Sequence, residues 1–421
     1  TTESGSHDYF KSDFFNRINP EQTVSRPVYC VAVRWSCRRA TERLHGSQMV
    51  TTADQVFSQP TAVIRQATPE GPPVRVLVAD DDPEIRALVR RVFAASPDCS
   101  DCLEAEDAED VFTTLETSPP DVILLRSSLA GMNGLQATRS IMVRHPVPII
   151  IMADVGEEDL DRAFECLRSG ALDIVMRTEA ALSSSETLAR VVSLARQAKE
   201  LQPRQDAPEA QTGASAFPVK ALFLMAGTGA LGSALRVYQD CDLAASIPVV
   251  LVTALPPSLL PEFVRWLDET FENGAKLADL ATGQPLKAGP LNVVVASALP
   301  RVVASDDKGV ILAGLPDGPW AAPLTPSGEN GFDVLLASAA EVAAKETVAV
   351  MLGGLHSSGA AGLSLLKRAG GRAFVELPAL CPFARSSFTA VRIGAADAYA
   401  NVSHLVTLLD GLSAQQAVSG A

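Results

Sequence analysis

Short apolar runs alternate with stretches of helical spacing in the first half of the chain. Strands are predicted at residues 74–79, 121–126, 148–153 and 173–177, and Cys99 opens a further strand. Helical patterns such as 83–95 separate them, so that five strands and five helices fit. This alternation is typical of a parallel sheet that is covered by helices on both faces. Residues 74–201 are therefore predicted to form a doubly wound α/β domain.

The same alternation returns after an interruption. Residues 202–217 are rich in Pro, Gln, Ala, Gly and Ser, which is typical of an interdomain linker. Beyond this linker, strands are predicted at 221–225, 248–252, 293–296, 348–352 and 373–375, and helices at 262–271, 334–344 and 360–369. Residues 218–412 are therefore predicted to form a second, mostly parallel α/β domain, which a tail at 413–421 follows.

Length and composition agree with two folded domains and leave a long segment outside them. The chain has 421 residues, 47% of them hydrophobic, which is enough to bury two cores of ordinary size. Residues 1–73 show no sustained periodicity and contain many Gly, Ser, Pro and Thr breakers. We expect this segment to be a poorly ordered extension.

Charge and hydropathy exclude two classes of partner. A formal net charge of −14 disfavours binding to a phosphate backbone, which depends on clustered Lys and Arg. The longest apolar runs, such as 147–153, are far shorter than the roughly 20 residues that span a bilayer. We therefore expect a cytoplasmic protein that neither binds nucleic acid nor inserts into a membrane.

Neither the cysteines nor the glycine-rich turn predicts a metal or nucleotide site. The seven cysteines lie scattered in apolar segments, which indicates reduced, buried thiols. Cys99 and Cys102 form a lone CxxC without the further ligands of a zinc site, so we interpret the pair as structural and leave a redox role open. The turn at 226–229 is rich in glycine but lacks the Lys and Ser/Thr of a P-loop, so it does not predict a nucleotide site.

Three carboxylates follow the first predicted strand. Asp80, Asp81 and Asp82 come at the edge of the sheet where parallel strands end. Carboxylate oxygens are the ligands that Mg²⁺ prefers, so a magnesium site is one interpretation. The other is that these residues are solvated loop charges or cap the following helix.

Four segments of the first domain carry a family resemblance: VRVLVADDDPEIRALVR, PDVILLRSSLAGMNGLQA, PIIIMAD and SGALDIVMR. They are similar to the four signature regions of the response-regulator receiver family. The resemblance implies a flavodoxin-like fold, in which Asp80 and Asp81 would hold Mg²⁺ beside a phosphoacceptor aspartate. At the matching positions this chain has Arg126 for the phosphoacceptor, Ala153 for a hydroxyl residue and Arg177 for a lysine.

Arg126 changes what this receiver can do. A guanidinium cannot attack phosphorus as a carboxylate does, so we predict that no aspartyl phosphate forms at this position. One hypothesis is that Arg126 projects between Asp80 and Asp81 and substitutes for the metal. The alternative is that its side chain snorkels to solvent and leaves the pocket empty.

Four segments of the second domain carry another resemblance: LMAGTGALG, VLVTALPPSLLPEFVRWL, FDVLLASAAEVA and VMLGGLHSSGAAGLSLLKRAGG. They are similar to segments in the catalytic domain of the chemotaxis protein-glutamate methylesterase family, CheB, and the order of receiver, linker and esterase is also that of the family. The resemblance implies a Rossmann-like fold and a Ser-His-Asp triad that hydrolyses the methyl ester of a receptor glutamate. The triad positions fall on Gly227, Ala254 and Ser358, none of which keeps the family's residue.

Neighbouring residues offer a substitute pair. Thr228 follows the vacant nucleophile position, and His356 lies on the loop that should approach it. We interpret Thr228 instead as a helix cap and His356 as a solvated or hydrogen-bonding residue. Ser386 and Ser387 are likewise interpreted as turn residues or caps rather than nucleophiles.

Three functions are consistent with these residues. The one we favour is a noncatalytic regulator or scaffold in a chemotaxis or two-component pathway, without a cofactor. Its partners would be signalling proteins: a chemoreceptor, a histidine kinase or another regulator. The alternatives are a diverged methylesterase that depends on Thr228 or His356, and a structural protein that forms oligomers.

Overall fold

The structure is a computed structural model that describes residues 71–199, 217–282, 284–307, 309–314, 330–355 and 358–419. The predicted extension up to residue 70 and the predicted linker from 202 to 216 lie outside these ranges. Among the described residues, none of the helices combines the length and the hydropathy that crossing a bilayer requires.

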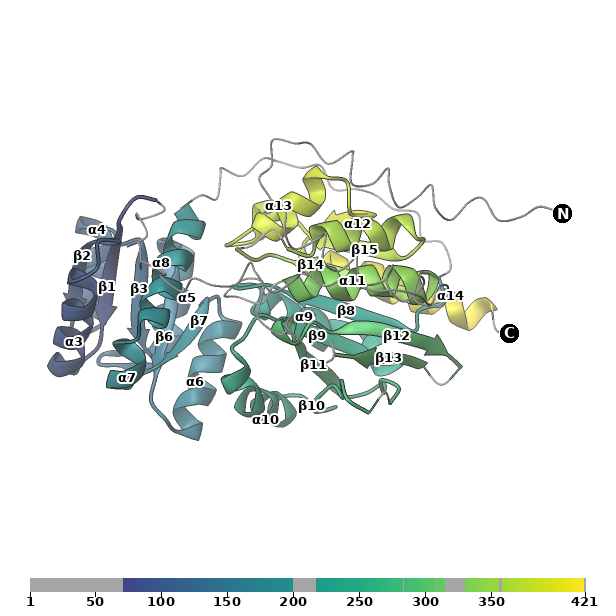
Figure 1. The fold of residues 1–421 in the computed structure, drawn as a ribbon, viewed down its shortest axis with the longest axis horizontal. Helices are drawn as coiled ribbons and strands as arrows, with labels where there is room; N and C mark the ends of the chain where they lie inside the picture. The colour runs from purple at the N-terminus through teal and green to yellow at the C-terminus, as the bar shows by residue number, and fades with distance from the viewer. Residues whose placement is uncertain are drawn as a thin grey trace, which may run out of the picture. The chain divides into compact units, whose positions relative to one another are not determined.

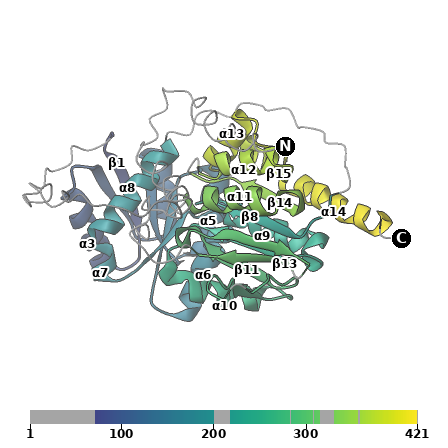
Figure 2. The same cartoon turned by 45° about the vertical axis from the view of Figure 1, so that its right-hand side comes forward.

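The first domain is a five-stranded parallel sheet with helices on both faces (Figures 1 and 2). Its strand order is β2-β1-β3-β6-β7, formed by β1 (Val74–Ala79), β2 (Cys99–Ala105), β3 (Val122–Arg126), β6 (Ile149–Ala153) and β7 (Asp173–Met176). The helices are α3 (Pro83–Ala94), α4 (Ala108–Thr117), α5 (Gly134–Arg144), α6 (Glu157–Arg168), α7 (Glu179–Leu182) and α8 (Ser185–Lys199). Buried residues of α3, α7 and α8 pack on one face, and those of α4, α5 and α6 on the other.

The register of this sheet aligns its carboxyl edge. Ala79 pairs with Leu125, and Arg126 pairs with Met152, so that β1, β3 and β6 end side by side. These three strands are buried along nearly their whole length, as parallel strands between two helical layers must be. Asp80, Arg126 and Ala153 therefore come to the same edge, as the sequence predicts.

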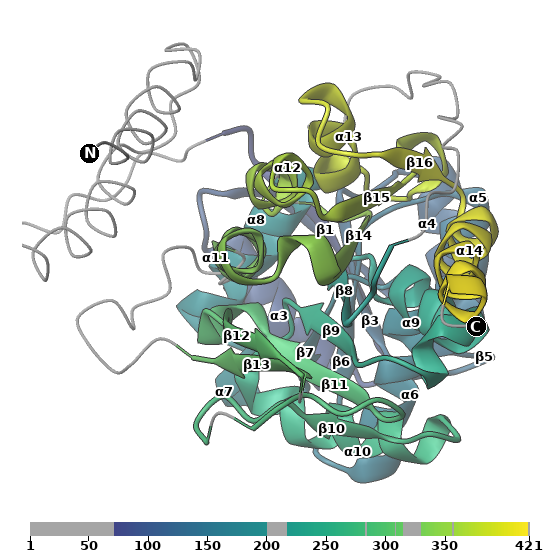
Figure 3. The same cartoon turned by 90° about the vertical axis from the view of Figure 1, so that its right-hand side faces the viewer.

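The second domain is a seven-stranded parallel sheet in the order β10-β11-β9-β8-β14-β15-β16. Its strands are β8 (Ala221–Ala226), β9 (Val249–Thr253), β10 (Ala275–Leu277), β11 (Leu291–Val295), β14 (Thr347–Leu352), β15 (Arg372–Glu376) and β16 (Ala398–Ala400). The helices α9 (Leu231–Asp240), α10 (Leu260–Thr270) and α14 (Val402–Ser419) pack on one face. The helices α11 (Asn330–Val342), α12 (Ala360–Arg368) and α13 (Arg385–Arg392) pack on the other (Figure 3).

Both domains confirm the predicted α/β class, and the second adds elements that the pattern did not predict. The edge strands β10 and β16 have three residues each, too few for a periodicity to be visible. A hairpin of β12 (Arg301–Asp306) and β13 (Gly309–Ala313) is also additional. Helix α14 runs to Ser419, so most of the segment predicted as a tail is helical.

The cysteines in the described ranges are free thiols. Cys102 is buried, and burial raises its pKa to about 12, so this thiol is protonated at neutral pH. A protonated, buried thiol is a poor nucleophile and a poor metal ligand. These properties agree with the structural interpretation of the CxxC segment.

Candidate functional site

A largely buried arginine, Arg177, occupies the carboxyl edge of the receiver sheet; its side chain is 11% exposed. The Arg177 guanidinium binds both carboxylate oxygens of Asp80, with Nε 2.7 Å from Oδ2 and Nη2 2.9 Å from Oδ1. It also donates to Asp82 and Asp154, each at 3.2 Å. Asp80 is fully buried, so its charge depends on this bidentate partner. The hydrogen bonds with Asp80 raise the pKa of Arg177 above its ordinary value, although burial opposes the shift.

Arg126 lies in the same pocket. Its Nη1 donates to Asp81 and is 3.9 Å from Oδ1 of Asp80, while Nη2 is 3.7 Å from Oδ2 of Asp154. The side chain is 22% exposed. Arg126 thus points between the two carboxylates, as the metal-substitution hypothesis predicts, and does not snorkel away from them.

The residues of this pocket do not fit a divalent cation in the arrangement observed. Both oxygens of Asp80 already accept hydrogen bonds from Arg177, and Oδ1 accepts a further one from the Asp82 backbone N–H at 2.9 Å. Arg126 places a second positive charge where a third oxygen ligand would be needed. Within the described ranges, no group of three or more His, Cys, Asp and Glu side chains is arranged to hold a metal ion.

A second layer of polar contacts lies beneath this pocket, and no local sequence pattern marks it. The Ser127 hydroxyl donates to Oδ1 of Asp159 at 2.6 Å, and the Asp154 backbone N–H donates to Oδ2 at 2.6 Å. Asp159 lies in the first turn of α6, so one carboxylate joins the ends of β3 and β6 to this helix. The Ala153 side chain is fully buried and adds no polar group.

The esterase domain brings its predicted site residues to one sheet edge. Ala226 pairs with Thr253 on one side and with Leu352 on the other, so β8, β9 and β14 end together. Gly227 and Ala254 follow the first of these pairs directly, and Ser358 lies on the loop after β14. The topology therefore gathers the three positions that the resemblance assigns to a triad.

Gly227 lies next to the backbone of Gly354 and the side chain of Ser386. A Cβ built on Gly227 would be 3.5 Å from the Cα of Gly354 and 3.7 Å from Oγ of Ser386, which are ordinary contact distances. Gly354 has a φ of +112° and donates its N–H to the Phe383 carbonyl at 2.6 Å. Ser386 is buried in α13, which has no side-chain cap, so its interpretation as a turn or cap residue was wrong. Ser387 is also buried in this helix.

Of the two proposed substitutes for the triad, the structure describes only Thr228. Thr228 is half-buried in the turn after β8, and its carbonyl accepts the Leu355 N–H at 3.2 Å. Helix α9 has Ala230 at its N-cap and no side-chain cap bond, so the interpretation of Thr228 as a cap was wrong. His356 lies outside the described residues. The histidines that the structure does describe, His145 after α5 and His404 in α14, lie on neither of the loops that carry Gly227 and Ser358.

A buried acid completes this edge. Glu376 ends β15 and accepts a hydrogen bond from the Ser233 hydroxyl at 2.8 Å and from the Gly353 N–H at 3.1 Å. Burial, and then the charge of Glu376, raise the pKa of the Cys381 thiol well above its ordinary value. Glu376 therefore ties α9 and the loop after β14 to the sheet, and Cys381 remains a neutral thiol.

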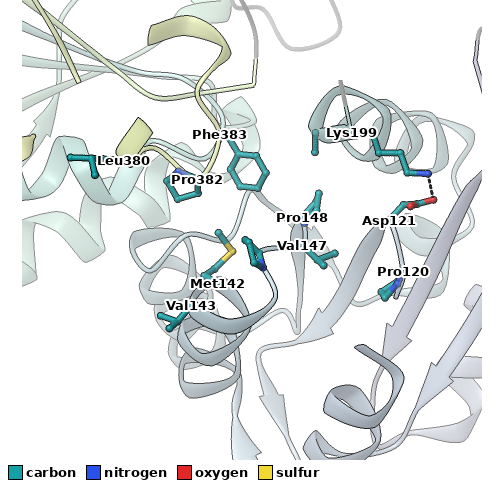
Figure 4. A pocket seen from close by; sticks show the side chains of 12 residues that line it. Pro120, Asp121, Met142, Val143, Val147, Pro148, Lys199, Leu380, Pro382 and Phe383 are labelled. Atoms are coloured by element: carbon teal, nitrogen blue, oxygen red, sulfur yellow. Dashed lines mark ion pairs between the residues drawn. The ribbon is translucent and has the colours of Figure 1, made fainter. Parts of the chain in front are cut away.

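A further cavity reaches Phe383, whose carbonyl accepts the Gly354 N–H beside the esterase sheet edge. It has a volume of about 540 Å³ and is lined mostly by proline and apolar side chains, with the ion pair between Lys199 and Asp121 at one side (Figure 4). The apolar lining includes Met142, Val147 and Phe383. No nucleophile with a neighbouring base lines this cavity, so it does not compete with the strand-end sites.

Together, the two folds and their strand-end sites define a receiver domain joined to an esterase-type α/β domain. Residues 76–183 match the response regulator receiver domain family, and residues 222–409 match the CheB methylesterase family. The chain belongs to the CheB family of protein-glutamate methylesterases.

Curated relatives that match this chain over nearly their whole length share one printed name. A protein-glutamate methylesterase/protein-glutamine glutaminase of Anaeromyxobacter dehalogenans is 30% identical over 78% of this chain and 95% of that protein. One of Paramagnetospirillum magneticum is 29% identical over 77% of this chain and 93% of that protein. The crystal structure of the Thermotoga maritima CheB methylesterase catalytic domain is 22% identical, covers 46% of this chain and 98% of its own, and has a TM-score of 0.38.

Proposed function

We propose that this chain is a noncatalytic member of the CheB family, which acts as a regulator or scaffold by binding signalling proteins. Its relatives are named as methylesterases and glutaminases, activities that need an activated nucleophile. The proposal is that this chain keeps the family's fold and uses its surface instead of that chemistry.

One observation carries the proposal. At the edge where the family's nucleophile is expected, Gly227 offers no side chain, and its backbone packs against Gly354. Ala254, at the position expected for the base, has no proton acceptor in its side chain. Loss of a whole triad typically lowers kcat by on the order of 10⁶-fold, so hydrolysis would fall to background.

The receiver supports the same conclusion. A phosphorylated receiver signals through a new negative charge at the phosphoacceptor, but here Arg126 is paired with Asp81. The Asp80 carboxylate is held by Arg177 rather than left open for a metal. The proposal is therefore that this domain binds its partners in a single state.

The alternative function is diverged hydrolysis of receptor methyl esters or glutamines. Its best candidate nucleophile is Thr228, or Ser386, whose hydroxyl would lie 3.7 Å from a Cβ at position 227. Both residues have polar or electrostatic contacts with the rest of the chain. An enzyme of this kind would lose its activity when the hydroxyl that acts as its nucleophile is removed.

The test measures hydrolysis and binding on the native chain. Methanol release from a methylated chemoreceptor and ammonia release from its glutamine form are compared with those of Thr228→Ala, Ser386→Ala and the exposed control Ser403→Ala. We expect background rates throughout, and a stable complex with the cytoplasmic domain of a chemoreceptor or with a histidine kinase. Turnover that Thr228→Ala or Ser386→Ala abolishes and Ser403→Ala preserves would overturn the proposal. Absence of any complex would refute the scaffold role.

The triple variant Gly227→Ser, Ala254→His, Ser358→Asp is the matched positive control. It places a serine, a histidine and an aspartate at the three positions that the resemblance assigns. Methanol release above background from this variant alone would support both the assignment and the inactivity of the native chain.

A further inference from the structure

Helix α6 of the receiver is built into the packing of the esterase domain. One continuous cluster of buried apolar residues runs from the receiver face that carries α4, α5 and α6 to the esterase face that carries α9, α10 and α14. The described residues between 67 and 421 form one compact unit. The contact on α6 therefore resembles the interior of a single domain more than the polar interfaces that usually separate domains.

Aromatic side chains form the centre of this contact. Phe164 of α6 and Phe263 of α10 are fully buried, with ring centroids 5.3 Å apart in an edge-on arrangement. Trp266, also on α10, lies 5.7 Å from Phe164 and 5.8 Å from Phe263. Separation of the domains would expose all three rings to water, which the hydrophobic effect opposes.

The backbones of α6 and α9 meet directly. A Cβ added at Gly232 of α9 would be 2.1 Å from the carbonyl oxygen of Arg168 at the end of α6. No side chain fits at this distance, so only glycine permits the contact. The Arg168 guanidinium also donates to Oε1 of Gln239 on α9, at 2.9 Å.

Arg265 of α10 adds charge pairing at the rim. Its Nε is 3.0 Å from Oε1 of Glu157, and its Nη2 is 2.5 Å from Oδ1 of Asp161, both on α6. Its Nη1 also lies 3.0 Å from Oε2 of Glu269, which belongs to the same helix as Arg265. The guanidinium of Arg265 therefore pairs with carboxylates of both domains.

The position of α6 is fixed from the receiver side as well. Asp159 in its first turn accepts hydrogen bonds from Ser127 at the end of β3 and from Asp154 at the end of β6. Asp154 is in turn paired with Arg177. The helix that faces the esterase domain is thus held by contacts that involve no metal and no phosphoryl group.

We infer that α6 joins the receiver and the esterase domain of this chain permanently, so that the two domains unfold as one cooperative unit and do not separate in response to a phosphoryl signal. This inference does not depend on whether ester hydrolysis survives. It concerns a contact that both a scaffold and an enzyme would contain, and its test contains no hydrolysis measurement.

The test is hydrogen exchange followed by mass spectrometry, on the full chain across a urea series. Peptides from β1 and β3 report on the receiver, and peptides from β8 and β14 report on the esterase domain. We expect the protection of all four strands to disappear at the same urea concentration. Loss of receiver protection at a clearly lower concentration than that of the esterase strands would overturn the inference.

Interface variants sharpen this result. Gly232→Ala, or Arg265→Ala if the first variant does not fold, is expected to split the single transition so that the receiver strands lose protection first. The matched controls are Gly411→Ala, where nothing lies within 4 Å of the added Cβ, and Arg236→Ala, which removes an exposed arginine of α9. Controls that split the transition equally, or interface variants that leave it unsplit, would contradict a junction on α6.

A further hydrogen-exchange experiment adds Mg²⁺ and beryllofluoride, a phosphoryl analogue that binds an aspartate phosphoacceptor. We expect the exchange of α6 to stay unchanged when both are added. A rise in the exchange of α6 on their addition would show that the junction opens, and would overturn the inference.

Discussion

Replacing Arg177 by methionine tests whether a guanidinium holds the receiver pocket together. Methionine keeps an unbranched side chain but removes every donor, so the Asp80 carboxylate loses its bidentate partner. Asp80 is fully buried, and a charge that is left there without a partner cannot be solvated. We therefore expect a large loss of stability from a residue outside the hydrophobic core.

The structure sets the size of the effect. Removing one partner of a buried ion pair typically costs about 3–5 kcal/mol of the free energy of unfolding. Here the Asp82 N–H still donates to Asp80 at 2.9 Å, and Arg126 remains 3.9 Å from its Oδ1. These remaining contacts favour the lower end, about 3 kcal/mol.

Urea unfolding measures the change in the free energy of unfolding for Arg177→Met and for two comparison variants. Arg90→Met removes a surface ion pair in which Nε of Arg90 lies 3.1 Å from Oε1 of Glu104; the arginine side chain is 60% exposed. This variant is expected to lower the free energy of unfolding by less than about 1 kcal/mol. The double variant Asp80→Asn, Arg177→Met removes both charges and is expected to recover a large part of the loss. A cost below about 1 kcal/mol for Arg177→Met, or no recovery in the double variant, would refute a pocket held by this pair.

Further predictions concern the two sites and the thiols. After incubation with acetyl phosphate and Mg²⁺, Phos-tag electrophoresis should show no hydroxylamine-labile band, because Arg126 offers no carboxylate that could accept the phosphoryl group. A hydroxylamine-labile band in the native chain would contradict this prediction. Gly227→Ser should change the free energy of unfolding by less than about 1 kcal/mol, because the added Cβ would meet neighbouring atoms only at ordinary contact distances. Gly354→Ser should lower the free energy of unfolding by more in the same urea assay, because Gly354 has a φ of +112° that other residues rarely adopt. Burial raises the pKa of three thiols to about 12: Cys102, Cys166 and Cys241. The stabilisation from keeping these thiols protonated in the folded state is fully present below the ordinary pKa of 9.0. As pH rises from 9 toward 12, the free energy of unfolding should fall by about 1.4 kcal/mol per thiol for each pH unit. Replacing the thiols by alanine one at a time should make this pH dependence less steep at each step.

The strand-end positions could be predicted because they depend on local pattern. Buried parallel strands give continuous apolar runs, and the residue that follows each run must lie at the carboxyl edge. Asp80 and Arg126 were placed together in this way, and so were Gly227 and Ala254. The same reasoning missed the edge strands β10 and β16, because three residues cannot display a period.

The surroundings of the sites could not be predicted, since they depend on packing between distant segments. Ser386 faces Gly227 because the loop after β15 returns across the end of β14 before α13 begins, and no local signal marks that return. Asp159 reaches Ser127 only through the rotation of α6 about its axis. Glu376 is a similar case, because no local pattern in the sequence distinguishes it from other charged residues. In the structure it is buried and accepts hydrogen bonds from Ser233 of α9 and from Gly353 after β14.

The exchange at position 126 has a simple electrostatic consequence. If the family's phosphoacceptor is an aspartate, replacing it by arginine changes the local charge from −1 to +1, a difference of two units, which is the charge of Mg²⁺. The pocket thus gains permanently the compensation that a bound divalent cation would supply only at sufficient concentration. Converging carboxylates without a metal repel one another and resist burial, so a receiver that loses its phosphoryl chemistry needs another cation to keep its shape. Arg126 beside Asp81, with Arg177 across Asp80, provides that cation from the chain itself.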